Sequence, residues 1–501
     1  MDVFDLREAL IEEYSAFARS FTKIRAADLR EPIDRAYEEG RFWPEPLVQI
    51  NPRYKLARTV AELAASGELH PTCASLFDIR LYQHQEYAIA LASKGESFVV
   101  TTGTGSGKSL AFFIPIVDAV LRARAADPTP RTRAIVVYPM NALANSQMEE
   151  LKKFLGDAGP VTFARYTGQE EAEERERIRN NPPDILLTNF MMLELLMTRQ
   201  AELDRAVIRN CKGLRFLVLD ELHTYRGRQG ADVAMLVRRV RERLAGEMMQ
   251  CIGTSATMVS GEGQGDGNRR VAEVASRIFA TPITGFNVVT EDLERATNPA
   301  ETAETVRGRL GAVLDAGLPR GITNAELRDH PLAIWVETRL GLARPDGGKW
   351  VRARPMTLAA AAERLADDAG RPVELCERAL REFLLVASTP ERERPDARGR
   401  WEEPFFAFKL HQFISGAGVA YATLDPPGKR AVVLEGQQFF EDETHRLYPV
   451  YFCRECGQEY YSVRLRTENG DRLVLQRDID DMPARREDTV EGGADDGADA
   501  T

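Results

Sequence analysis

The sequence has few cysteines for its length, six in 501 residues, which excludes a disulfide scaffold. It has no apolar run near the roughly 18 residues that a membrane-spanning helix needs. The N-terminus lacks the basic start and apolar stretch of a signal peptide. Basic residues are too few for a uniformly basic nucleic-acid-binding surface, because 66 Lys and Arg face 77 Asp and Glu. We therefore expect a soluble, cytoplasmic protein, which still allows a local basic groove.

Length and composition predict several domains. At roughly 150 residues per domain the chain should hold about three, and a hydrophobic content of 44% excludes wholesale disorder. Two amphipathic segments within 357–387, joined by Gly-Arg-Pro, resemble a winged helix and equally an ordinary helical hairpin. The expected parts are an N-terminal helical accessory region (1–70), an α/β domain (71–262), a helical region (263–400), a β-rich module (401–480) and an acidic disordered tail (481–501).

Short apolar runs alternate with helical stretches between about residues 80 and 260. Runs that are apolar throughout are typical of strands buried on both faces, and their alternation with helices indicates a parallel sheet. We predict an open α/β fold whose ligands bind at the carboxyl ends of the strands. The runs are SFVVT (97–101), AIVVYP (134–139), VTFARY (161–166), DILLT (184–188), RFLVLD (215–220) and QCIGTS (250–255).

The first run leads into a glycine-rich loop, TTGTGSGKS, which opens a helix. Thr102 stands where the strict P-loop pattern has glycine, but three glycines further on free the backbone to curl its N–H groups around phosphate. Lys108 would reach the β- and γ-phosphates, and the Ser109 hydroxyl would ligate Mg²⁺. The predicted phosphate site consists of Thr102, Gly103, Thr104, Gly105, Ser106, Gly107, Lys108 and Ser109.

A second motif, LVLDELHTYRG (217–227), delivers Asp220 and Glu221 to the edge of the sheet, as in a Walker B motif. Asp220 would hold Mg²⁺ through water, and Glu221 would orient or deprotonate the attacking water. His223 would sense the γ-phosphate or link the site to Thr257. An acidic surface turn is a poor alternative because Asp220 closes an apolar run. The predicted catalytic residues are Lys108, Asp220, Glu221 and His223.

Smaller motifs indicate which kind of P-loop NTPase this is. Gln85 precedes Lys108 by 23 residues and suits the reading of an adenine edge. The segments YPMNALANSQ, YTG and LLTNFMML each follow a strand, and their hydroxyl, amide and backbone groups suit contacts to the phosphates of a nucleic-acid strand. The predicted nucleic-acid contacts are Pro139, Asn141, Thr167, Gly168, Thr188 and Asn189.

These motifs resemble those of superfamily 2 helicases. TGTGSGKS is similar to their motif I, PMNALANSQ to motif Ia, DELH to a DExH-type motif II, SAT to motif III, and Gln85 to the glutamine of the Q motif. The stretch DELHTYRGRQGADVAMLVRR further resembles the large bacterial DExH helicases related to Lhr and MrfA, including the Druantia phage-defence helicase. The resemblance implies a RecA-like P-loop domain that uses ATP and Mg²⁺ to translocate on or unwind nucleic acid. It favours DNA over RNA as the substrate, and DNA repair or phage defence as the pathway. Ser255 and Thr257 would couple the two sites.

The Q-x-x-G-R-x-x-R motif of the family's second RecA-like domain is not found in the sequence. Its arginines complete the ATP site, so the chain resembles the N-terminal portion of a larger helicase, or a half that needs a partner subunit. We expect weak hydrolysis by the chain alone. Two alternatives stay open: a nucleotide-gated nucleic-acid-binding module without ATPase activity, and a non-helicase P-loop ATPase acting on protein partners.

Cys453 and Cys456 form a C-x-x-C motif followed by Gly457, half of a zinc knuckle. A structural zinc site needs four ligands, and His445 or residues beyond the end of the sequence would have to supply the others. The alternative is a pair of thiols in a β-turn.

Overall fold

The structure is a computed structural model that divides into two compact units. The sheet unit comprises Arg53–Glu294 with Arg344–Val351, and the helical unit comprises Met1–Pro52, Arg295–Ala343 and Arg352–Thr501. Thr104, Thr257 and the acidic tail predicted at 481–501 lie outside the described residues. The structure describes residues 2–20, 23–103, 105–156, 159–256, 264–345, 348–396, 404–415, 420–434, 436–441, 444–468 and 471–477.

The sheet unit is built on a seven-stranded parallel sheet in the order β11-β5-β10-β9-β6-β8-β7. Six strands coincide with the six apolar runs, and β11 was missed because it lies in the region expected to be helical (263–400). This confirms the RecA-like open α/β fold. The strands are β5 (Phe98–Thr101), β6 (Ala134–Tyr138), β7 (Phe163–Arg165), β8 (Ile185–Asn189), β9 (Leu214–Leu219), β10 (Ala245–Ser255) and β11 (Val288–Thr290).

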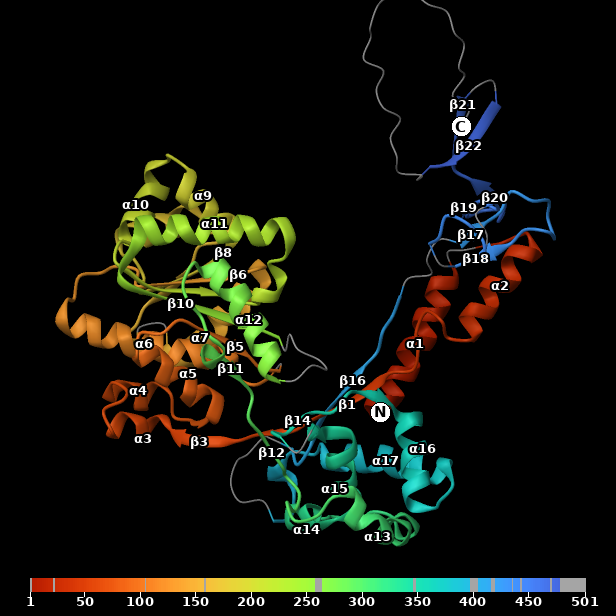
Figure 1. Cartoon of the computed structure of the whole chain (residues 1–501), viewed down its shortest axis with the longest axis horizontal. Coiled ribbons are helices and arrows are strands. Elements are labelled where there is room, and N and C mark those ends of the chain that lie inside the picture. The colour runs from red at the N-terminus through yellow and green to blue at the C-terminus, as the bar shows by residue number, and fades with distance from the viewer. Residues whose placement is uncertain are drawn as a thin grey trace, which may run out of the picture. The chain divides into compact units, whose positions relative to one another are not determined.

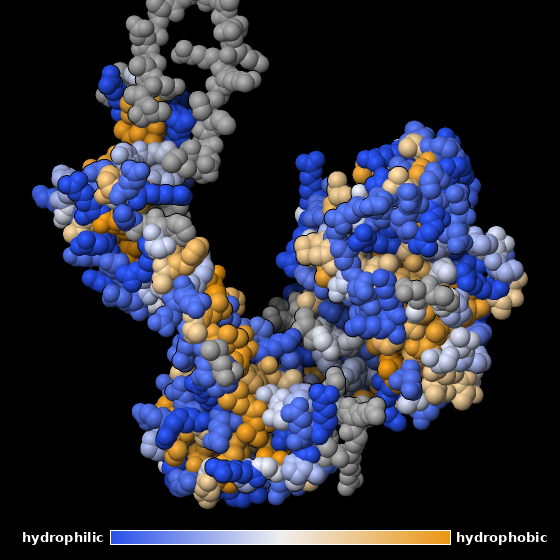
Figure 2. All heavy atoms as spheres, turned by 180° about the vertical axis from the view of Figure 1, so that it is seen from behind, coloured by the Kyte–Doolittle hydropathy of each residue, from blue (hydrophilic) through white to orange (hydrophobic). Residues whose placement is uncertain are grey.

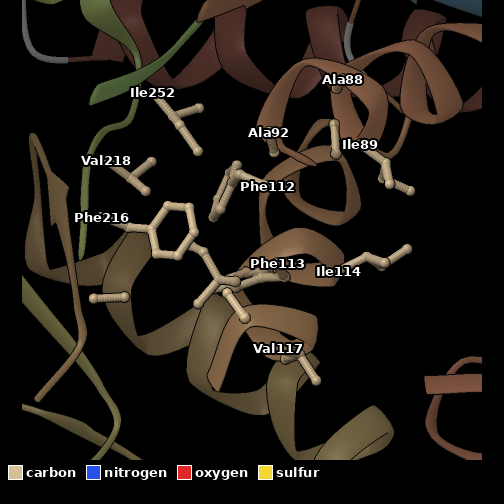
Figure 3. Close-up of a cluster of buried hydrophobic side chains, with 14 of the residues drawn as sticks. Ala88, Ile89, Ala92, Phe112, Phe113, Ile114, Val117, Phe216, Val218 and Ile252 are labelled. Atoms are coloured by element: carbon tan, nitrogen blue, oxygen red, sulfur yellow. The ribbon is translucent and has the colours of Figure 1, made fainter. Parts of the chain in front are cut away.

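Helices cover both faces of the sheet (Figure 1). Phe216 and Val218 of β9 point into one core, and Leu217 and Leu219 point into the other, because successive side chains of a strand face opposite sides. Figure 3 shows the first core, where Phe112 lies among strand and helix side chains. This core is formed with α5 (Gln83–Ser93), α6 (Lys108–Ala126) and α7 (Asn141–Leu155), and the opposite one with α9 (Phe190–Thr198), α10 (Glu202–Asn210), α11 (Gly227–Leu244) and α12 (Gln264–Phe279).

The sheet unit is wider than the expected 71–262. At its end, β11 pairs with β5 and carries the unit past residue 262. At its start, Val60 and Leu63 are buried in the first core, so this segment belongs to the sheet unit. The remaining elements are β2 (Arg53–Tyr54), β3 (Leu56–Thr59), α3 (Val60–Ala65), α4 (Pro71–Leu76), β4 (Arg80–Tyr82), α8 (Ala172–Asn180), the 3₁₀ turns η1 (Leu222–Thr224) and η2 (Gly285–Asn287), β12 (Leu293–Glu294) and β14 (Val351–Arg352), whose last residue lies in the helical unit.

The helical unit combines helices with small antiparallel sheets, β15-β1-β16 and β18-β17-β19-β20 among them. Helices α16 and α17 form the pair expected within 357–387, separated by the left-handed Gly370 (φ +62°). The helices are α1 (Val3–Ser20), α2 (Ala27–Glu38), α13 (Ala303–Ala316), α14 (Asn324–Asp329), α15 (Pro331–Val336), α16 (Leu358–Ala369), α17 (Val373–Ala387), η3 (Glu337–Gly341) and η5 (Glu391–Glu393). The strands are β1 (Leu47–Asn51), β13 (Leu342–Ala343), β15 (Met356–Thr357), β16 (Ala407–His411), β17 (Ala420–Ala422), β18 (Val432–Val433), β19 (Tyr448–Phe452), β20 (Glu459–Tyr461), β21 (Val463–Glu468) and β22 (Asp471–Gln476).

The visible surface of the sheet unit is largely hydrophilic (Figure 2). Hydrophilic side chains cover much of the visible face of the sheet unit, on the right in Figure 2. In the described part of the chain no helix is both long and apolar enough to cross a bilayer.

Candidate nucleotide and nucleic-acid site

The glycine-rich loop joins β5 to α6 in a conformation that requires two of its glycines. Gly105 (φ +82°) and Gly107 (φ +66°) are left-handed, where a side chain is disfavoured. A Cβ on Gly107 would also lie 2.5 Å from Nε2 of Gln85. Within the loop the hydroxyls of Thr102 and Ser106 are hydrogen-bonded at 2.6 Å. This hydrogen bond and the two left-handed glycines shape the described part of the loop before the first turn of α6.

Two consecutive side chains of helix α5 form hydrogen bonds to this loop. His84 Nε2 lies 2.9 Å from the Ser106 carbonyl oxygen, and Gln85 Nε2 donates to the Gly107 carbonyl at 3.0 Å. A carbonyl only accepts, so His84 must carry its proton on Nε2. Burial lowers the pKa of His84, which favours this neutral form.

These contacts use half of the hydrogen-bonding capacity of the Gln85 side-chain amide. Its side-chain oxygen accepts from the Tyr82 amide at 2.9 Å, and the residue is 2% exposed. One amide hydrogen and one lone pair stay unused by these bonds. The adenine contact predicted for Gln85 therefore has to use those two.

The acidic turn after β9 is anchored to β10. The Thr254 hydroxyl donates to Asp220 Oδ1 and accepts from the Glu221 amide at 3.1 Å. Burial is the main cause that raises the pKa of Asp220, and the charge of Glu221 adds to it, while the Thr254 hydrogen bond and Lys108 oppose it. Glu221 is left-handed (φ +51°), an uncommon and strained backbone for a side-chain-bearing residue. Such strain is found where function fixes a side chain.

The two motifs meet at the carboxyl ends of β5, β9 and β10. Lys108 Nζ lies 3.9 Å from Glu221 Oε1 and donates to the Ser255 carbonyl at 3.4 Å. His223 Nδ1 lies 3.2 Å from Glu221 Oε2 and 3.3 Å from Ser255 Oγ. His223 thus contacts the first residue of Ser-Ala-Thr, whereas the predicted link to Thr257 lies outside the described residues. Ser109 is half-buried at the second position of α6.

The residues present fit a nucleotide phosphate with Mg²⁺. Glu221 Oε2 is a buried oxygen that makes no hydrogen bond within the described residues, although His223 Nδ1 lies 3.2 Å from it. The site combines the Lys108 ammonium group, the carboxylates of Asp220 and Glu221 and the N-terminus of α6. This is the set of donors and acceptors that phosphate and a hard cation require. Lys108 and the loop amides would hold phosphate, and Ser109 and Asp220 would hold the cation.

The residues predicted for nucleic-acid contact gather at a neighbouring part of the same sheet edge, which we call the rim (Pro139, Asn141, Thr167, Gly168, Thr188 and Asn189). Asn189 Nδ2 donates to Asn141 Oδ1 at 2.6 Å and to the Thr167 carbonyl at 3.2 Å. β6, β8 and β7 are adjacent, so the ends of three strands are tied together. Thr188 is fully buried and its hydroxyl donates to the Tyr166 carbonyl, so it supports the rim from within.

Cys453 and Cys456 lie in the turn between β19 and β20. The Cys453 amide donates to Gln458 and its carbonyl accepts from Gly457, both at 2.9 Å. Backbone N–H groups, that of Cys456 first, lower the pKa of the Cys453 thiol. Within the described residues, no group of three His, Cys, Asp or Glu side chains is placed to hold a metal ion. The pair has two of the four ligands that structural zinc needs, and zinc stays a prediction.

Comparison with known families decides what the nucleotide site belongs to. Residues 82–262, which contain both motifs and the rim, match the DEAD/DEAH box helicase family. These residues are a DEAD/DEAH box helicase domain. The glycine-rich loop, the DELH turn and the tied strand ends all lie within this domain.

Relatives of this helicase domain are long proteins. The chain is 28% identical over 364 residues to the Druantia protein DruE of Escherichia coli, covering 48% of the chain and 19% of that protein. It is 34% identical over 183 residues to the uncharacterized ATP-dependent helicase YprA of Bacillus subtilis, covering 36% of the chain and 23% of that protein. Among solved structures, DNA-bound helicase MrfA is 25% identical with a TM-score of 0.38, covering 48% of the chain and 32% of that protein. The chain thus spans about a fifth of the two curated relatives.

Three residues of the helicase domain were missed by the sequence analysis. His84 is adjacent to Gln85 in LYQHQ, and its approach to Ser106 needs the fold to bring them together. Thr254 lies within an apolar strand directly before Ser-Ala-Thr, and a hydroxyl beside that motif was the available signal. Glu170 accepts a hydrogen bond from the Thr167 amide, and an acidic residue beside the YTG segment was its signal.

Proposed function

We propose that the sheet unit is the first motor domain of an ATP-dependent nucleic-acid helicase or translocase. The observation that carries this proposal is the convergence of two sites on one sheet edge. The nucleotide motifs follow β5, β9 and β10, and the rim follows β6, β7 and β8. An open α/β sheet binds ligands at this edge, so one domain can hold nucleotide and strand side by side.

In this proposal Lys108 neutralises charge on the β- and γ-phosphates, and Glu221 takes a proton from the attacking water. Mg²⁺, when bound, supplies further neutralisation of the phosphate oxygens. Asp220 and Ser109 hold that cation. His223, between Glu221 and Ser255, keeps the carboxylate oriented and connects it to the end of β10.

The rim would bind the backbone of a single strand. Asn141 and Gly168 are accessible in part, and their amide and backbone groups carry no sequence information, which suits a motor that moves along any sequence. We take single-stranded DNA as the first ligand to test and RNA as the comparison.

Completion of the ATP site by a second RecA-like domain, from a longer chain or a partner subunit, is part of this proposal. An arginine inserted from outside contributes on the order of 10³–10⁵ in rate to phosphoryl transfer. The chain alone is therefore expected to bind ATP with Mg²⁺ and to turn it over slowly.

The experiment is a steady-state ATPase assay with and without single-stranded DNA, run beside equilibrium binding of a labelled oligonucleotide. Binding of both ligands with slow turnover supports the proposal. Failure to bind any nucleic acid would contradict it and favour an ATPase that acts on proteins. Fast strand-stimulated turnover would contradict the need for an external arginine.

A further inference from the structure

The turn that follows β7 holds a carboxylate where the proposed function needs a phosphate. Glu170 Oε2 accepts from the Thr167 amide at 2.8 Å and from the Gly168 amide at 2.9 Å. Glu170 Oε1 accepts from the Thr167 hydroxyl at 2.9 Å and from Arg165 Nε at 2.8 Å. Four donors therefore converge on one carboxylate.

This donor set is the one that proteins use for phosphate. Successive backbone N–H groups in a turn make a concave anion site, and a hydroxyl and a guanidinium strengthen it. Gly168 (φ +91°) provides the left-handed residue that turns the two amides toward one point. The three residues Thr167, Gly168 and Arg165, with these donors, are called the nest below.

Glu170 is well seated in the nest. Its side chain is 3% exposed. Burial opposes ionisation, but the Thr167 amide and hydroxyl and the Arg165 guanidinium outweigh it, so the pKa of Glu170 lies below its ordinary value. At neutral pH the nest therefore holds a negative charge supplied by the chain itself.

The nest is continuous with the rim. The Thr167 carbonyl accepts from Asn189 Nδ2, which also binds Asn141. A strand whose phosphates follow Asn141 would meet the nest next. Its phosphate and the Glu170 carboxylate would then compete for the same four donors.

We propose that Glu170 is an internal surrogate for a backbone phosphate of the strand. It holds the nest in shape while no strand is bound and is displaced when a phosphate enters. This inference rests on the proposed function, because it takes the rim to be a nucleic-acid site. Displacement also frees Arg165, which then faces the phosphate instead of Glu170. Because the carboxylate competes with the phosphate, the affinity of the chain for a strand is lower than it would be if the nest were empty.

The test is the affinity of the full chain for a fluorescent oligo(dT), measured by anisotropy at fixed salt. Glu170→Gln keeps the size of the side chain and one acceptor oxygen but removes the charge. We expect it to bind the oligonucleotide about tenfold more tightly, because the phosphate no longer has to replace a charged carboxylate in the hydrogen bonds of the nest. Glu173→Gln, an exposed residue in the first turn of α8, is the matched control for loss of one negative charge.

A second probe isolates the phosphate. An oligonucleotide with an uncharged methylphosphonate backbone cannot compete for the nest as an anion, so the gain of Glu170→Gln should vanish with it. Equal gains on both backbones, or a gain shared by Glu173→Gln, would overturn the inference. So would unchanged or weaker binding of oligo(dT) by folded Glu170→Gln, which would make Glu170 a brace of the turn.

Other outcomes are also decisive. If the wild type binds no nucleic acid, the proposed function falls first and this inference with it; if the wild type binds and Glu170→Gln gains nothing, only the inference falls. Should Glu170→Gln fail to fold by circular dichroism, Glu170→Asp retains the charge but is one methylene too short to fill the nest, and it should also gain affinity. Loss of the fold in both variants would show that Glu170 cannot leave the nest, and would overturn the inference.

Discussion

The ammonium group of Lys108 lies 3.9 Å from the carboxylate oxygen Oε1 of Glu221. These residues are far apart in the chain, one at the start of α6 and the other after β9. The parallel sheet brings them together because β10 lies between β5 and β9 and all three strands end at the same edge. The cation proposed to bind phosphate and the base proposed to activate water therefore lie side by side at this edge of the sheet.

Glu221→Gln should bind ATP normally and lose turnover on the order of 10²–10⁴-fold, because the amide keeps the shape of the side chain but cannot take a proton. Equilibrium binding of a fluorescent ATP analogue and phosphate release by a sensitive coupled assay would check both halves. Glu242→Gln, exposed on α11, is the control. If Glu221→Gln hydrolyses ATP at the wild-type rate, Glu221 is not the base.

His84→Leu should weaken ATP binding about tenfold. It removes the donor to the Ser106 carbonyl and leaves that buried acceptor unpaired, so the phosphate loop loses its fixed shape. His84→Gln places an amide N–H at the position of Nε2 and should restore most of the affinity. A purely space-filling role would give the opposite order, with leucine at least as good as glutamine.

Acid should destabilise the chain through two histidines, the buried His84 and the half-buried His330. Burial lowers the pKa of His84 and of His330 below the ordinary 6.5, so the unfolded state binds more protons just below that pH. The free energy of unfolding should therefore rise with pH up to about 6.5 and lose this dependence above it. Urea unfolding between pH 5.5 and 7.5 would test this, with His84→Gln and His330→Gln each reducing the slope. An unchanged slope in both variants would contradict the assignment.

The strands and the nucleotide motifs could be predicted from sequence because both depend on local patterns. A strand buried on both faces needs an apolar run, and a phosphate loop needs glycine at Gly105 and Gly107 whatever surrounds it. Contacts set by topology left no such pattern. The bond from His84 to Ser106 joins a helix to a loop across 22 positions of the chain.

The sequence also did not show which side chains of the rim are exposed, or which of their hydrogen-bond donors are already in use. Thr188 and Asn189 are neighbours in one motif, yet Thr188 faces inward and is buried while Asn189 reaches Asn141. Thr167 has the donors expected of a phosphate contact, but Glu170 already uses them. The sequence pattern selected the segments for this prediction, and only the packing shows which side chains in them are available.

Separate loss of the two binding activities tests the central claim most directly. The wild type, Lys108→Ala and Asn141→Asp would each be titrated with an ATP analogue plus Mg²⁺ and with labelled single-stranded DNA. Both titrations of a given protein would use the same preparation. Lys108→Ala should lose nucleotide affinity and keep the strand. Asn141→Asp keeps the acceptor for Asn189 but repels phosphate, so it should lose strand affinity and keep the nucleotide. A wild type that binds neither ligand, or variants that change both affinities alike, would contradict two sites on one sheet edge.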